Sequence, residues 1–135
     1  MSNINEIKSS WIKEGMDREA VKFAETLAKE LVDLNDRGFT GRNAMTTSQV
    51  RNFFGEVRRI QMKGSNQNQS DFYMLQPKLA YAVARVGNRN AKINKFQEVT
   101  NQLLNFVDPK NVAEYDNLVS FLEAVVAYHK ANNGK

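Results

Sequence analysis

The sequence predicts an all-α protein, a single-domain bundle of about five amphipathic helices. Apolar residues recur every three or four positions along most of the 135-residue chain, and no segment alternates apolar and polar residues with a period of two. Turn-forming residues divide the chain into pieces of helical length. The length suits one domain with a modest core.

The first two expected helices have recognisable starts. A helix over residues 17–37 carries one apolar face, has Asp17 as its N-cap, and is followed by a glycine that favours termination. A helix over residues 46–62 begins with a capping box, because Thr46 is followed three positions later by Gln49.

Three further helices are expected in the second half of the chain. They cover residues 71–86, residues 91–107, and a last segment that follows Asp108-Pro109 and ends near residue 131. Pro77 lies inside the first of these, so we expect a kink or a new helix start there. Residues 17–131 thus make up the expected bundle.

Residues 1–16 form a possible N-terminal arm ahead of this bundle. The stretch from Ile4 to Ile12 is apolar and contains Trp11, the single tryptophan. Of two interpretations, we favour an extra helical turn folded onto the bundle. The other is a docking arm, since tryptophan is a common anchor at protein interfaces.

Composition limits the class of protein. There is no cysteine, which excludes disulfides and thiolate metal sites and fits a reducing, cytoplasmic location. No apolar run approaches the roughly 20 residues that a membrane-spanning helix needs. The N-terminus also lacks the apolar core of a signal peptide. We therefore expect a soluble cytoplasmic protein with no membrane partner.

The sequence does not predict an enzyme. His129 is the only histidine, and its place in the apolar arc of the last helix favours a packed or carbonyl-bonded side chain over a general base. No catalytic triad, glycine-rich phosphate loop or histidine pair is present. Glu114 and Asp116 are two positions apart on a helix and point in different directions. We expect no metal and no cofactor.

The charged residues are segregated along the chain. Between Arg37 and Lys95 there are eleven basic residues and two acids, Glu56 and Asp71, a net charge of +9. The rest of the chain carries eight basic residues and thirteen acids, a net charge of −5. This pattern indicates a polyanionic partner, most commonly nucleic acid, although a basic surface that serves only solubility remains an alternative.

Two expected helices carry this charge opposite their apolar arcs. On the helix over 46–62, Arg51, Gly55 and Arg58 share one stripe, which Arg59 flanks and Lys63 extends. A glycine inside a helix costs roughly 1 kcal/mol relative to alanine, and close approach by a ligand backbone or another helix is one reason to keep it.

On the helix over 71–86, Met74, Lys78, Tyr81 and Arg85 recur at helical spacing. Cations with an aromatic ring between them suit RNA, because the cations meet phosphates and the ring stacks on a base or ribose. Arg89 adds a further positive charge after this helix. The alternative is that both faces are simply solvated.

Three blocks of the sequence resemble the small subunit of the type III-A CRISPR effector, the Csm complex. The first runs from Thr46 through Phe54 to Ile60, the second is Leu75–Ala82 with Arg85, and the third is Phe121–Lys130. The blocks occur in the family's order and span about residues 42–130. The family often has a glycine before the arginine of the second block, where this chain has alanine.

The resemblance implies a non-catalytic helical subunit that stacks with copies of itself along the complex. Its partners would be target RNA and guide RNA, together with the backbone and large subunits of the effector. The resemblance implies RNA-binding roles for Arg51, Arg58, Arg59, Lys78 and Arg85, whereas Lys63, Tyr81 and Arg89 are candidates from charge and spacing alone. These residues would neutralise phosphates without reading bases.

Other classes remain open from the sequence. A helix-turn-helix-like DNA-binding protein would use Ser48, Gln49 and Asn52 to meet bases. A helical scaffold, or protein-interaction module, would use the Trp11 segment and ignore the basic faces. A small subunit of a related type III system would share the same pattern.

Overall fold

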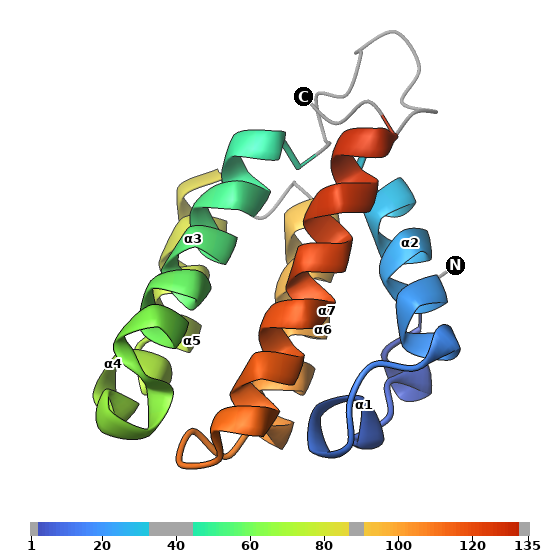
Figure 1. Cartoon of the computed structure of the whole chain (residues 1–135). Helices are drawn as coiled ribbons and strands as arrows, with labels where there is room; N and C mark the ends of the chain where they lie inside the picture. Colours follow the sequence, from blue (N-terminus) through green and yellow to red (C-terminus); the bar gives the residue numbers. More distant parts are fainter. Residues whose placement is uncertain (1–2, 33–44, 87–90, 133–135) are drawn as a thin grey trace, which may run out of the picture.

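The computed structural model describes residues 3–32, 45–86 and 91–132, and these residues form a helical bundle without a strand (Figure 1). The elements in chain order are η1 (Ile4–Glu6), α1 (Ser10–Lys13), α2 (Arg18–Val32), α3 (Thr47–Lys63), η2 (Ser65–Gln67), α4 (Gln69–Tyr73), α5 (Leu75–Val86), α6 (Ala91–Phe106) and α7 (Val112–Ala131). The five long helices α2, α3, α5, α6 and α7 confirm the predicted all-α bundle.

Both predicted helix starts are present. The Asp17 carboxylate accepts a hydrogen bond from the Ala20 N–H at 2.8 Å and so satisfies one free donor of α2. Thr46 and Gln49 form the reciprocal capping box at the start of α3, with N···O distances of 2.8 and 3.1 Å. The predicted end of the first helix near residue 37 lies outside the described residues.

The chain breaks near Pro77, as the sequence suggests, but the break comes three residues earlier, at Met74 between α4 and α5. Pro77 is therefore the third residue of α5, in the first turn, where backbone N–H groups have no partner within their own helix. A proline there costs no intrahelical hydrogen bond, so α5 continues undisturbed.

The helix α7 lies at the centre of the bundle, between α2 and α3 (Figure 1). Its side chains Tyr115, Leu118 and Phe121 are fully buried. The Tyr115 hydroxyl donates a hydrogen bond of 2.8 Å to the carbonyl oxygen of Val57 in the middle of α3. Burial raises the pKa of this hydroxyl well above its ordinary value, so it stays protonated and remains a donor.

A second buried contact holds the start of α3 against α7. The His129 side chain is 1% exposed, with Nε2 2.6 Å from the carbonyl oxygen of Met45 and Nδ1 3.4 Å from the Thr47 hydroxyl. Because a carbonyl oxygen can only accept, Nε2 carries the proton in this bond, and in the neutral imidazole Nδ1 is then an acceptor facing the Thr47 hydroxyl. Burial lowers the pKa of His129, and the bond to Met45 only partly opposes this. The packed histidine is confirmed, although its carbonyl partner precedes α3.

The N-terminal segment is folded onto the bundle. Trp11 is 1% exposed and packs between α2 and α7, with ring centroids 5.5 Å from Phe23 and 6.1 Å from Phe121. Lys13 Nζ also lies 3.0 Å from a carboxylate oxygen of Glu114 at the start of α7. A docking arm that presents Trp11 to a partner is therefore wrong, because the indole is already buried inside this chain.

We predict that Trp11→Ala lowers the free energy of unfolding by about 3–5 kcal/mol, because it removes a large buried aromatic side chain and leaves a cavity. Urea unfolding followed by far-UV circular dichroism measures this. Val21→Ala on α2 is the control, since Val21 is 37% exposed, and it should cost less than about 1 kcal/mol. A loss for Trp11→Ala no larger than the control's would contradict the packing.

Stability should also fall as the pH drops below about 6.5. The folded state lowers the pKa of His129, so the unfolded chain binds the proton more readily. The contribution is therefore complete above the unfolded pKa and is lost as the pH falls toward the lowered folded value. Unfolding free energies between pH 7.5 and 5 should show a shallower pH dependence for His129→Gln than for the wild-type protein. Equal slopes would exclude His129 as the cause.

Candidate nucleic-acid interface

The residues predicted to contact RNA are all exposed where the structure describes them. They are Arg51, Arg58, Arg59, Lys63, Lys78, Tyr81 and Arg85. They come from α3 and α5, which are neighbours on the side of the bundle away from α2 (Figure 1). The eighth residue, Arg89, lies outside the described residues.

A groove of about 450 Å³ separates the exposed sides of α3 and α5. Its lining residues are Met45, Gln49, Asn52, Phe53, Glu56, Lys78, Leu79, Ala82 and Arg85. Lys78 and Arg85 are seven positions apart, so their side chains stand on the same wall at heights about 10.5 Å apart. Tyr81 lies between them in sequence and is 68% exposed. The stripe expected on this helix is therefore confirmed as one exposed face.

The arginines of α3 divide into two groups. At 100° per residue, Arg51 and Arg58 lie about 120° around the helix from Asn52 and Glu56, which line the groove. Arg51, Gly55 and Arg58 therefore form a separate outer stripe of α3. Of the remaining residues, Lys78 and Arg85 line the groove. We call them, together with Arg59, Lys63 and Tyr81, the groove face.

The only two acids between Arg37 and Lys95 both pair with the groove face. Arg59 lies 3.0 Å from a carboxylate oxygen of Glu56 and 3.9 Å from one of Asp71. Lys63 lies 3.2 Å from Asp71, and Lys78 lies 3.7 Å from Glu56. The structure thus joins α3 to α5 through Glu56, and α3 to α4 through Asp71.

Sequence reasoning missed these pairings. The spacing of Glu56 and Arg59 at i and i+3 on a helix was a usable signal. No sequence signal could have placed Asp71 beside Lys63, because the intervening turn decides that contact. By contrast, Arg51, Arg58 and Arg85 form no ion pair with any other described residue, which leaves their guanidinium groups available to an external anion.

Nothing in the described part of the chain requires a glycine at position 55. A Cβ atom built on it would meet nothing within 4 Å, and its backbone lies within the regular helix α3. No described helix of this chain therefore approaches α3 closely at that point. Gly55, which lies between Arg51 and Arg58 on the outer stripe, faces solvent.

Three of the remaining sequence candidates, Gln49, Glu114 and Asp116, have structural partners, whereas Ser48 and Asn52 are exposed. Gln49 lines the groove, and its side-chain oxygen is already engaged in the capping box, which weakens its case as a helix-turn-helix base reader. Glu114 is bonded to Lys13 and the Asp108 N–H, and Asp116 accepts from Gln61 at 2.9 Å. Within the described ranges there is no group of three potential metal ligands and no helix long and apolar enough to cross a membrane.

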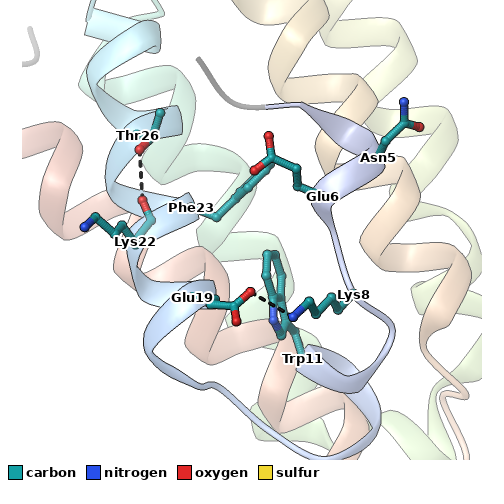
Figure 2. A pocket seen from close by; sticks show the side chains of 8 residues that line it. All are labelled: Asn5, Glu6, Lys8, Trp11, Glu19, Lys22, Phe23 and Thr26. Carbon is teal, nitrogen blue, oxygen red and sulfur yellow. Dashed lines mark hydrogen bonds and ion pairs between the residues drawn. The ribbon is translucent and has the colours of Figure 1, made fainter.

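A second hollow, of about 380 Å³, lies between the N-terminal segment and α2 (Figure 2). Trp11 and Phe23 contribute its apolar lining, and Lys8 and Glu19 form a 2.8 Å ion pair beside the indole. The hydrogen bond to Glu19 raises the pKa of Lys8. The charged residues that line this hollow are two acids, Glu6 and Glu19, and two bases, Lys8 and Lys22, so their charges balance. The groove between α3 and α5 is lined instead by one acid, Glu56, and two bases, Lys78 and Arg85.

A comparison with known families decides the identity. The family model described as Csm2 Type III-A matches residues 14–135, about nine-tenths of the chain. The chain belongs to this family. It is therefore a small subunit of a type III-A CRISPR effector, the Csm complex. No curated protein and no solved structure matches the chain.

The family match reaches further than the blocks in the sequence suggest. The resemblance spans about residues 42–130, whereas the match also includes α2 and the last residues of the chain. The stretch from η1 to α1, including Trp11, precedes the match, yet it supplies part of the buried core. In this Csm2-family chain the core therefore extends beyond the matched residues.

Because Gly55 has free space around it, Gly55→Ala should raise the free energy of unfolding by about 0.5–1 kcal/mol through helix propensity alone. The matched control is Ala80→Gly, at an exposed interior position of α5, which should lower it by a similar amount. Thermal and urea unfolding measure both changes. A destabilised Gly55→Ala variant would mean that a side chain does not fit there.

Proposed function

We propose that this subunit holds the phosphate backbone of target RNA paired to guide RNA, through the surface formed by α3 and α5 and without reading the sequence. Family membership supports assembly into the type III-A effector. The observation that carries the proposal is the charge of these neighbouring helices. Between Met45 and Val86 there are six basic residues and two acids, a net charge of +4.

The arrangement of side chains suits a nucleic-acid backbone. The outer stripe offers Arg51 and Arg58, and the groove face offers Lys78 and Arg85, each pair spaced by two helical turns or about 10.5 Å. Arginine forms forked hydrogen bonds with phosphate, and lysine adds a compact charge. A strand that follows either pair meets cations at two heights along the subunit.

Two uncharged positions support the same surface. Tyr81 is 68% exposed beside Lys78 and Arg85, and stacking of a base on an aromatic ring is worth about 1–3 kcal/mol. Gly55 lets a backbone come closer to α3 than any side chain would permit, and no described part of this chain uses that space. Both features fit contact with RNA better than a merely solvated helix.

The proposed binding is weak for one subunit and firm for an array. Contact with about 3–5 phosphates gives a salt slope of only about −2 to −3.5 on a single strand. Copies stacked as a filament along the effector raise the effective concentration of each subunit at the RNA, so retention grows with copy number. Cytoplasmic assembly with the backbone and large subunits belongs to this proposal.

A non-catalytic role fits the surroundings of the ionisable groups. His129 is buried, neutral and bonded on both ring nitrogens, so it is not placed for proton transfer with a substrate. Cleavage of nucleic acid is therefore assigned to other subunits of the complex. A protein scaffold that used Trp11 as its anchor has lost its main support, because Trp11 is buried.

The variant Arg51→Ala/Arg58→Ala/Lys78→Ala/Arg85→Ala should lose RNA retention, both as isolated protein and in the assembled complex. Each phosphate contact that is removed flattens the salt slope by about 0.7 on single-stranded RNA. Filter binding with mixed-sequence RNA between 50 and 300 mM salt measures both quantities. Tryptophan fluorescence checks that the variant is folded, because Trp11 is buried.

The matched control removes four positive charges elsewhere, as Arg18→Ala/Lys22→Ala/Lys29→Ala/Lys130→Ala on α2 and α7. It should retain RNA much better than the first variant, because its charges lie off the proposed surface. Equal losses would mean that net charge alone drives binding. Unchanged binding in the first variant would overturn the proposal, and strong preference for one DNA duplex would favour a DNA-binding protein.

A further inference from the structure

Glu56 and Asp71 occupy unusual positions for acids on a surface proposed to bind a polyanion. Glu56 lines the groove itself and contacts cations on both helices, Arg59 on α3 and Lys78 on α5. Asp71 contacts Arg59 and Lys63 at the end of α3. Two carboxylates therefore engage three of the cations of the groove face.

These ion pairs are open to exchange. The side chains of Glu56 and Asp71 are 40% and 38% exposed, and those of their three partners are 43–48% exposed. Exposed ion pairs contribute little to folding, because water and salt screen them and long side chains lose freedom in forming them. An arriving phosphate can therefore replace a carboxylate as the partner of the same cation.

We propose that Glu56 and Asp71 are built-in counter-charges that limit how tightly this surface holds RNA. This inference rests on the proposed function, since it concerns the same surface. In the free subunit the two carboxylates hold Arg59, Lys63 and Lys78. When RNA binds, phosphates take over these cations, and each displaced carboxylate remains close to the strand and opposes it.

The surface then has two kinds of cation. Arg51, Arg58 and Arg85 have no ion-pair partner among the described residues and can meet a phosphate directly. The cations held by Glu56 and Asp71 contribute less to RNA affinity. Each adds only the difference in free energy between pairing with a phosphate and pairing with a carboxylate. One subunit therefore binds more weakly, and with a flatter salt slope, than its number of basic residues implies.

This arrangement has a consequence for selectivity between free and assembled subunits. A lone subunit with partly neutralised cations holds unrelated RNA weakly, which keeps it available for assembly. In an array, several subunits engage one RNA together, and the affinity lost at each is offset by effective concentration. The acids thus make RNA retention depend more steeply on assembly.

The test compares the isolated wild-type protein with Glu56→Gln, Asp71→Asn and the double variant, using mixed-sequence single-stranded RNA across a salt titration. The amides keep the size of the side chains and remove only the charge. The matched control is Glu19→Gln, which breaks the 2.8 Å ion pair with Lys8 on the opposite side of the bundle. Unfolding followed by Trp11 fluorescence verifies that all variants fold.

RNA affinity should rise roughly two- to fivefold for each carboxylate neutralised at low salt, the effect of one charge about 5 Å from a phosphate in screened water. The salt slope should become steeper by up to about 0.7 for each neutralised acid. Glu19→Gln should change neither quantity appreciably, although it adds the same net charge. This combination separates a local counter-charge from an effect of net charge.

Weaker RNA binding by Glu56→Gln or Asp71→Asn would overturn the inference. It would mean that the carboxylates hold the neighbouring cations in the geometry that binds RNA. Unchanged affinity and slope would also overturn it. In both cases the proposed function stands if the fourfold variant with Arg51→Ala still loses RNA. If that variant and the acid variants all bind like the wild-type protein, the proposed function itself fails.

Discussion

The attachment of α3 to α7 is the constraint on which the rest of this structure depends. Two buried side chains of α7 donate hydrogen bonds to backbone carbonyls, Tyr115 to Val57 in the middle of α3 and His129 to Met45 just before α3 begins. Because these bonds lie in the core, they fix the rotation of α3 about its own axis as well as its position. That rotation determines which residues of α3 face solvent.

Once α3 is fixed, the charge of the surface follows. Its polar arc turns outward, and α5 packs beside it with Lys78 and Arg85 toward the intervening groove. The cations of the two helices become neighbours although about 20 residues separate them in the chain. The same packing brings Glu56 within reach of Lys78. The proposed attraction for a polyanion and its proposed limitation therefore both depend on one helix–helix contact.

The N-terminal segment shows a different relation between family and fold. Trp11 precedes the residues that match the Csm2 family model, yet it stacks on Phe121 in the central helix and contacts Phe23 in α2. A large aromatic ring at this place closes one side of the core. The segment therefore belongs to the structural core of this chain and leaves the α3–α5 surface uncovered.

The sequence by itself determined the helices and the segregation of charge, because both depend on local spacing. Helical periodicity, the caps at Asp17 and Thr46, and the stripe that contains Tyr81 are properties of neighbouring residues. Only the tertiary structure decided that Trp11 is buried and that Glu56 holds Lys78. Such contacts join residues far apart in the chain, and the rotation and packing of whole helices place them, which no local pattern encodes.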